Sequence, residues 1–82
     1  LAPRSPSDCF DTALEAVRIA VSYHTPVILL SDGDIANGSE PWRIPDVNSL
    51  KPIKHIFAKP GEPFEPYARH RDTLARQFAV PG

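Results

Sequence analysis

The sequence predicts an α/β fold: a partial βαβ unit of a parallel sheet, followed by an irregular, proline-rich connector. An unbroken apolar run, Val27–Leu30, stops at a polar turn, as strands buried on both faces of a parallel sheet do. Before this run, apolar residues recur at intervals of three and four, which is the helical period. Seven of the ten prolines lie from Pro41 onward, which disfavours regular helix and central strand there. We therefore expect a folded unit over residues 1–45 and a connector over residues 46–82.

The first complete element is expected to be a helix over about residues 6–24. Ser5 is suited to cap this helix and Pro6 to occupy its first position. Pro26 disfavours the helical conformation in the residue before it, so the helix should end near His24. The face expected to be buried carries Phe10, Ala13, Leu14, Val17, Ala20 and Val21.

A strand over about residues 26–31 is expected to follow the helix. Leu1–Pro3 would be the tail of a preceding strand, so that strand, helix and strand make most of a βαβ unit. A strand that is apolar on both faces needs neighbouring strands and covering helices, and one helix with two strands does not supply them. We therefore expect the chain to be an excerpt of a larger α/β protein, with poor stability on its own.

The connector is expected to be extended and anchored by aromatic side chains. Pro52–Phe57 has the composition of an edge strand, and Lys59–Tyr67 is expected to be extended or polyproline-like. Asp72–Phe78 is expected to make a short helical turn capped by Asp72. Long irregular segments in compact domains are usually functional or are linkers. We therefore expect the connector to lie against another surface.

Composition argues against several classes of function. The formal net charge is −1 and the basic residues are not gathered on one face, which argues against a nucleic-acid partner. No apolar run approaches membrane-spanning length and no signal peptide is visible, so no membrane contact is expected. The single cysteine, Cys9, cannot form an internal disulfide and fits a reducing compartment, so a cytoplasmic protein is expected.

The polar loop after the strand is the first candidate site, because ligands and partners of α/β sheets collect at the carboxyl ends of strands. The spacing of Asp32, Asp34 and Asn37 fails the EF-hand pattern, since Ala36 and Asn37 occupy its fifth and sixth positions. The sequence N-G-S from Asn37 matches a glycosylation sequon, which is expected to be unused without a secretory signal. No residue is therefore predicted to be catalytic, cofactor-binding or metal-ligating.

Seven residues are instead predicted to lie at an interface or in the loop that serves it. Trp42 is the expected anchor, because a large aromatic side chain with an N–H donor needs a surface to pack on. Arg69, Arg71 and Arg76 are suited either to clamp a carboxylate or diphosphate or to form ion pairs between subunits or domains. The predicted interface set is Asp32, Asp34, Asn37, Glu40, Trp42, Tyr67 and Arg69.

Two stretches of the sequence resemble one enzyme family in order and spacing. The first, from Ser5 to Trp42, is S-x-x-D-x-F-D-x-A-x-E-A-V-R-I-A-x-x-Y-x-T-P-V-I-L-L-S-D-G-x-x-A-N-G-S-E-P-W, and it is most specific in T-P-V-I-L-L-S-D-G and A-N-G-S-E-P-W. The second, from Phe64 to Gly82, is F-E-P-Y-A-R-H-R-D-T-L-A-R-Q-F-A-V-P-G. With these stretches the chain resembles the α subunits of 2-oxoacid:ferredoxin oxidoreductases, most closely those acting on 2-oxoglutarate. The resemblance covers nearly the whole chain.

This resemblance implies a reaction and a place in an enzyme complex. The family decarboxylates 2-oxoacids oxidatively, joins the acyl group to coenzyme A and passes electrons through iron–sulfur clusters to ferredoxin. Thiamine diphosphate and Mg²⁺ lie between a pyrimidine-type domain and a diphosphate-type domain, the latter in the β subunit. Residues 1–45 would then be the end of the pyrimidine-type domain, and residues 46–82 an inter-domain connector. The family's catalytic residues lie in other segments, so the isolated chain is expected to be inactive.

A second hypothesis stays open at the level of sequence. In it, the chain is a small non-catalytic interaction module whose proline-rich tail binds a groove on a partner. An upstream pyrimidine-type domain in the same reading frame would favour the enzyme, whereas a start codon near Leu1 would favour the module.

Overall fold

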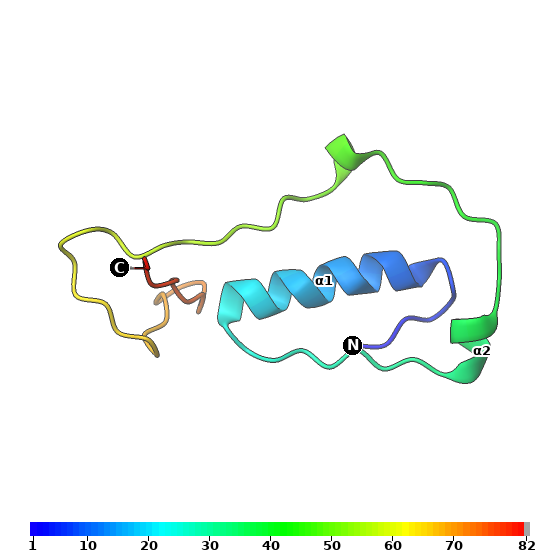
Figure 1. Ribbon diagram of the computed structural model, residues 1–82, viewed down its shortest axis with the longest axis horizontal. Coiled ribbons are helices and arrows are strands. Elements are labelled where there is room, and N and C mark those ends of the chain that lie inside the picture. Colours follow the sequence, from blue (N-terminus) through cyan, green and yellow to red (C-terminus); the bar gives the residue numbers. More distant parts are fainter. Residues whose placement is uncertain (82) are drawn as a thin grey trace.

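The computed structural model describes residues 1–81, which form an elongated body of 51 × 27 × 27 Å. Its elements are the helices α1 (Asp8–Tyr23) and α2 (Gly33–Asn37) and a short 3₁₀ helix, η1 (Val47–Ser49). Figure 1 shows α1 as a central rod: the chain turns back along it to α2, then returns on the other side to a lobe at its C-terminal end. α1 is therefore the frame on which the chain is arranged. Gly82, the last residue of the predicted connector, lies outside the described residues.

α1 lies within the range that the sequence predicts. The Ser5 hydroxyl accepts a hydrogen bond from the Asp8 amide at 3.3 Å. However, α1 begins at Asp8 with Ser7 at its N-cap position, so the prediction that Ser5 caps the helix and Pro6 takes its first position is wrong. These two residues form the turn that leads into the helix, as the hydrogen bond from the Cys9 amide to the Pro6 carbonyl also shows. At the other end His24 is left-handed, with a φ of 49°, so the helix ends before Pro26 as predicted.

α1 covers little of its predicted apolar face in the described residues. Ala16, which is 9% exposed, is the buried residue of this helix, and it does not belong to that face. Phe10 and Val17 do belong to it and are 36% and 48% exposed. The prediction of a covered face is therefore wrong for residues 1–81, because they form no sheet to lie on it.

Residues 26–31 are extended but form no regular strand, which corrects the predicted strand. The Leu1 amine donates to the Ile28 carbonyl and the Leu30 amide to the Leu1 carbonyl, both at 2.8 Å. This is the hydrogen-bond pattern of one parallel pair, formed by Leu1 and Leu29. A single pair leaves side chains uncovered, and Ile28 is 73% exposed. The described chain therefore leaves both faces of this segment uncovered, as the sequence predicts for one helix and two strands without further neighbours.

The connector contains an isolated parallel bridge between Phe57 and Phe78. The Phe78 amide donates to the Ile56 carbonyl at 2.7 Å, and the Phe78 carbonyl accepts from the Ala58 amide at 2.8 Å. The edge strand predicted over Pro52–Phe57 is thus reduced to this bridge, because the partner segment contributes only one residue.

The predicted helical turn over Asp72–Phe78 is wrong. The chain closes a tight turn on His70 instead: the His70 carbonyl accepts from the Leu74 amide at 2.9 Å, and the His70 amide donates to the Ala75 carbonyl at 2.8 Å. Leu74 is left-handed, with a φ of 62°, and this conformation cannot continue a right-handed helix. Lys59–Tyr67 contains turns but neither helix nor strand, as its prolines predict.

Replacing Leu74 with glycine should raise the free energy of unfolding by about 1 kcal/mol, because glycine adopts a positive φ without the steric cost of an L side chain. The Leu74 side chain is 56% exposed, so the substitution removes little packing. Urea unfolding of the purified protein measures the change.

Leu50 provides the matched control, since its φ of −73° is ordinary. Leu50→Gly should lower the free energy of unfolding, because glycine there only increases the entropy of the unfolded chain. Equal losses of stability in the two variants would contradict the left-handed turn at Leu74.

Candidate functional site

The predicted loop folds into α2, and its polar side chains serve that helix. The Asp32 carboxylate accepts a hydrogen bond from the Ile35 amide at 2.8 Å, which is an N-cap contact. The Asn37 side-chain amide donates to the Gly33 carbonyl at 2.9 Å. Asp34 lies exposed in the first turn, where negative charge suits the helix dipole. These three predicted site residues therefore act in a local turn.

The segment Gly38–Trp42, here called the N-terminal clasp, docks on the start of α1. The Glu40 carboxylate accepts a hydrogen bond from the Ser7 amide at 2.6 Å, across 33 positions of sequence. The first amides of a helix have no partners within it and carry partial positive charge, so a carboxylate is stabilised there. Hydrogen bonds from the Ser7 hydroxyl, the Ser7 amide and the Ser5 hydroxyl hold the pKa of Glu40 below its ordinary value of 4.5. Glu40 is therefore an anionic cap supplied by a distant segment.

Two further contacts hold the N-terminal clasp in place. The Trp42 ring lies 5.5 Å from the Phe10 ring between centroids, at an interplanar angle of 49°. At Gly38, a Cβ atom would stand 2.6 Å from the Asp34 carbonyl oxygen and 3.3 Å from the Pro6 side chain. Only glycine allows the backbone this close an approach, so α2 and the start of α1 lie on either side of it.

The other end of α1 is held by the segment Arg69–Phe78, here called the C-terminal clasp. The Arg76 amide donates to the Ser22 carbonyl at 2.9 Å, and the Arg76 guanidinium to the His24 carbonyl at 3.2 Å. The last carbonyls of a helix have no partners within it and carry partial negative charge, so a cation is stabilised there. α1 therefore receives an anion at its start and a cation at its end.

Arg69 adds a second cation to the C-terminal clasp, since its guanidinium donates to the Tyr23 carbonyl at 3.4 Å. Arg76 also donates to the Pro66 carbonyl, at 3.0 Å from its Nε, and its guanidinium stands 5.2 Å from the Tyr67 ring centre. Both arginines are thus engaged by backbone carbonyls rather than arranged around an open anion site.

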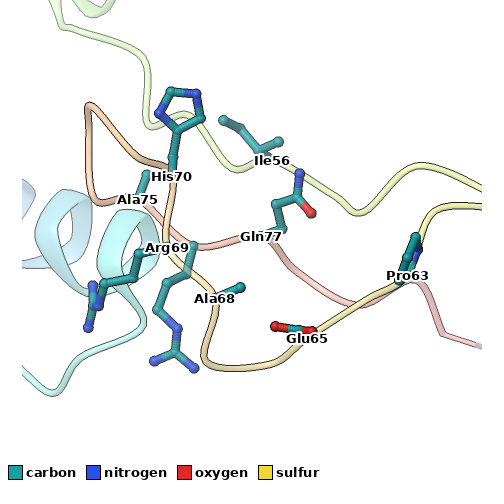
Figure 2. A pocket seen from close by; sticks show the side chains of 9 residues that line it. Ile56, Pro63, Glu65, Ala68, Arg69, His70, Ala75 and Gln77 are labelled. Atoms are coloured by element: carbon teal, nitrogen blue, oxygen red, sulfur yellow. The ribbon is translucent and has the colours of Figure 1, made fainter.

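A hollow of about 420 Å³ lies beside the C-terminal clasp. Figure 2 shows the side chains around it, which come from the connector and from the clasp itself. The wall contains apolar, acidic and basic side chains. Its electrostatic potential is therefore not uniformly positive or negative, as a site selective for a charged ligand would be. The residues that define it include Ile56, Glu65, Ala68, Arg69, His70, Arg76 and Gln77.

The described residues do not fit a thiamine diphosphate, magnesium or iron–sulfur site. Within residues 1–81 no three His, Cys, Asp or Glu side chains are grouped to hold a metal ion. The sequence has one cysteine, Cys9, whereas an iron–sulfur cluster takes about four thiolates. The Asp32 carboxylate and the Arg69 and Arg76 guanidinium groups are already engaged by the backbone. In the same part of the chain, neither helix is long and apolar enough to cross a membrane.

Comparison with known proteins identifies the family. Residues 1–82 match the family described as pyruvate flavodoxin/ferredoxin oxidoreductase, thiamine diphosphate-binding. The chain belongs to this family. The resemblance carried by residues 5–42 and 64–82 is thereby confirmed, and the family implies the α/β class of fold. No solved structure matches the chain.

Two curated relatives show which members of the family the chain resembles. The chain is 88% identical over its whole length to the 2-oxoglutarate oxidoreductase subunit KorA of Mycobacterium tuberculosis. Over 62 residues, 76% of the chain, it is 37% identical to the 2-oxoglutarate synthase subunit KorA of Methanothermobacter marburgensis. The chain spans 13% and 16% of the lengths of these two curated relatives. It therefore corresponds to a small segment of a much longer subunit.

The structure separates the predicted interface residues into groups. Asp32, Asp34 and Asn37 act in α2, and Glu40 and Trp42 form the N-terminal clasp. Tyr67 and Arg69 lie with the C-terminal clasp, at the other end of α1. Five of the seven residues thus lie near the start of α1, and the other two lie near its end.

The sequence prediction missed the partners of these residues. The Ser7 amide donates to Glu40, and the Phe10 ring packs on Trp42. Neither Ser7 nor Phe10 is in the predicted interface set. Arg76 was considered only as a clamp for a ligand or an ion pair, although it caps α1 with both its amide and its side chain. The predicted helix was the sequence signal for these contacts. Every helix end leaves backbone amides or carbonyls without partners, so capping groups were to be expected at both ends.

Replacing Glu40 with glutamine should remove a pH-dependent part of the stability. Because the pKa of Glu40 is lowered on folding, the stabilisation is complete above the ordinary value of 4.5 and is lost as pH falls through the lower folded-state pKa. The difference in unfolding free energy between wild type and Glu40→Gln should therefore shrink over that acid range. Urea unfolding of the full-length subunit across acid pH measures it.

Glu62→Gln is the control for this prediction. The Glu62 carboxylate accepts no hydrogen bond in the described residues, so the same charge change should leave stability nearly unaffected. A Glu40→Gln curve that stays parallel to wild type at every pH would contradict a bound carboxylate at the start of α1.

Replacing Arg76 with lysine should lower the free energy of unfolding by about 1–2 kcal/mol, although the charge is kept. A lysine ammonium lacks the planar fork that donates at once to the His24 and Pro66 carbonyls. Arg71 is exposed, so Arg71→Lys is the matched control and should change stability by at most about 0.5 kcal/mol. Equal effects of the two substitutions would rule out a specific cap by Arg76.

Proposed function

We propose that the chain is a segment of the α subunit of a thiamine diphosphate-dependent 2-oxoglutarate:ferredoxin oxidoreductase. The observation that carries the proposal is the 88% identity, over the whole chain, to a 2-oxoglutarate oxidoreductase subunit. The more distant relative is also named for 2-oxoglutarate, which supports this substrate over other 2-oxoacids. The reaction is the oxidative decarboxylation of 2-oxoglutarate to an acyl-coenzyme A, with electrons passed to ferredoxin.

Within that enzyme the segment acts as scaffold and interface. Its partners are the β subunit of the same enzyme and, through the complex, ferredoxin and coenzyme A. Thiamine diphosphate, Mg²⁺ and the iron–sulfur cluster are held by other parts of the complex, because the residues of this chain fit none of them. The free Cys9 is in keeping with a reducing cytoplasm.

The proposed place in the fold rests on the pair formed by Leu1 and Leu29. α1 lies between the two members of this parallel pair in sequence, which is the connection of a βαβ unit. We assign residues 1–45 to the end of the pyrimidine-type domain and residues 46–82 to the connector that leaves it. In the whole subunit, neighbouring strands would cover the exposed side chains of residues 27–30.

The two clasps give the connector its role. The N-terminal clasp fixes the point where the chain leaves the domain, and the C-terminal clasp returns it to the same helix. Trp42 remains 48% exposed and Tyr67 86% exposed, which leaves aromatic surface on each clasp for a neighbouring domain or the β subunit. The seven predicted interface residues therefore serve docking rather than chemistry in this proposal.

An independent interaction module is less well supported. The family match includes the proline-rich segment Lys59–Tyr67 together with α1, so the tail is part of the same family sequence. The Phe78 ring, 4.1 Å from the His24 ring between centroids, and the contacts of Arg76 also join this tail to the end of α1. A tail that served a separate partner would not need these contacts.

An activity assay on the complete complex tests the proposed function. The full-length subunit, purified with its partner subunit, should reduce a viologen dye only when both 2-oxoglutarate and coenzyme A are present. The isolated 82-residue chain should give no rate above a blank, because its residues fit no cofactor. A complex that reduces the dye with pyruvate but not with 2-oxoglutarate would contradict the substrate assignment.

Replacing Trp42 with alanine in the full complex should weaken the docking of the connector, because the contact between the indole and Phe10 is lost. Since the indole is partly exposed, the free energy of unfolding should fall by only about 1–2 kcal/mol. Subunit association, measured by sedimentation, should weaken, and loss of thiamine diphosphate should follow only as a consequence. Asp32→Asn and Asp34→Asn are the controls and should be milder, since turn roles survive the amide swap. If Asp32→Asn abolishes cofactor binding in an intact complex, the loop contacts the cofactor directly.

A further inference from the structure

The junction between α2 and the N-terminal clasp has a chemistry of its own. Asn37 is the last residue of α2 and Gly38 the first of the clasp, and both are exposed. An asparagine followed by glycine has no Cβ on its C-terminal neighbour to shield the backbone nitrogen between them. The side-chain amide carbon of Asn37 is therefore open to attack by that nitrogen.

We propose that Asn37 is a site of spontaneous deamidation, giving aspartate and isoaspartate. The Gly38 backbone nitrogen attacks Cγ of Asn37, forming an N–Cγ bond, while the Cγ–Nδ2 bond breaks. Ammonia leaves, and its extra proton comes from the Gly38 amide. Water then opens the five-membered imide at either carbonyl. The balance is one water gained and one ammonia lost, with no change of oxidation state.

The folded α2 restrains this reaction. Nδ2 of Asn37 donates to the Gly33 carbonyl at 2.9 Å, and Asp32 caps the first turn through the Ile35 amide. However, α2 has only five residues and buries none of them. A helix this short depends on its caps and opens at little cost. Opening of α2 is therefore the step that exposes Asn37 to attack.

The isoaspartate product would disturb the N-terminal clasp. It inserts a methylene group into the backbone three positions before Glu40. The backbone at Gly38 has no room for such an addition, since even a Cβ there would stand 2.6 Å from the Asp34 carbonyl oxygen. The shift would draw Glu40 away from the Ser7 amide, which it now contacts at 2.6 Å.

Peptide mapping of the aged full-length subunit tests the proposal. Trypsin cuts after Arg18, Arg43 and Lys54, so Asn37 and Asn48, the two asparagines of the chain, fall in separate peptides. Asn48 is also exposed but precedes Ser49, which carries a Cβ, so it is an internal control. After incubation at mildly alkaline pH, Asn37 should lose its side-chain amide at least about tenfold faster than Asn48, because glycine leaves the nitrogen unshielded. Tandem mass spectrometry, which assigns the mass gain of deamidation to Asn37 or to Asn48, measures both rates and separates them from isomerisation at Asp32, which also precedes a glycine.

Two variants complete the test. Asp32→Ala should speed deamidation of Asn37 about fivefold, the factor expected for loss of one helix cap. Asn37→Gln should abolish the mass gain of deamidation in its peptide and leave the Asn48 peptide unchanged. Equal rates at the two asparagines, or conversion of Asn48 before Asn37, would overturn the proposal. An unchanged rate in Asp32→Ala would overturn the opening of α2 as its controlling step.

Discussion

The unpaired backbone groups at the two ends of α1 are the constraint on which this structure depends. A helix cannot satisfy its own first amides or last carbonyls, and water is the alternative partner. Here the partners are side chains from distant segments: Glu40 at the start, and Arg69 and Arg76 at the end. The signs of these charges match the helix dipole at both ends. Polar caps therefore decide where the connector meets the helix.

Apolar packing makes a smaller contribution within the described residues. Ala16 is the buried apolar residue of α1, while Ile28, Leu30 and Ile44 are 63–80% exposed. The ring pairs that join the connector to the two ends of α1, Trp42 with Phe10 and Phe78 with His24, stand next to the polar caps. The exposed apolar surface is in keeping with a chain that spans 13% of its 88%-identical relative. Specific contacts at the helix ends hold the arrangement while most apolar surface is left for the rest of the subunit.

Features governed by near neighbours in sequence were predictable. Pro26 sets the end of α1, because proline sterics act on the residue before it. Ser5 and Pro6 give only the approximate start, since they form the turn before Asp8, where the helix begins. Residues 26–31 are extended as expected, but their burial depends on strands that the described chain lacks. The left-handed Leu74 carries no sequence signal, since leucine rarely adopts that conformation.

The residue types of the candidate site give no information on its pairing, and that its seven residues form an interface stays a prediction. Glu40 and Arg69 were identified, yet the cap at the start of α1 spans 33 positions and that from Arg76 to His24 spans 52. Any exposed carboxylate or guanidinium is chemically suited to such a contact, so composition does not select the partner. The family resemblance was predictable because it depends on the order of residues alone, which residues 5–42 and 64–82 preserve.

Because the two clasps bind opposite ends of α1, the length of this helix fixes how far apart they lie. The N-terminal clasp contacts the start of α1 and the C-terminal clasp contacts its end. Adding or removing one residue within α1 would turn one end by about 100° and move it by about 1.5 Å, which would aim the carbonyls of Ser22 and His24 away from Arg76. The span between the clasps contacts α1 through the Arg18 guanidinium, which donates to the Lys51 carbonyl at 3.3 Å. A change of length in this span would shift that contact, whereas a change of length within α1 would misplace the caps at its end.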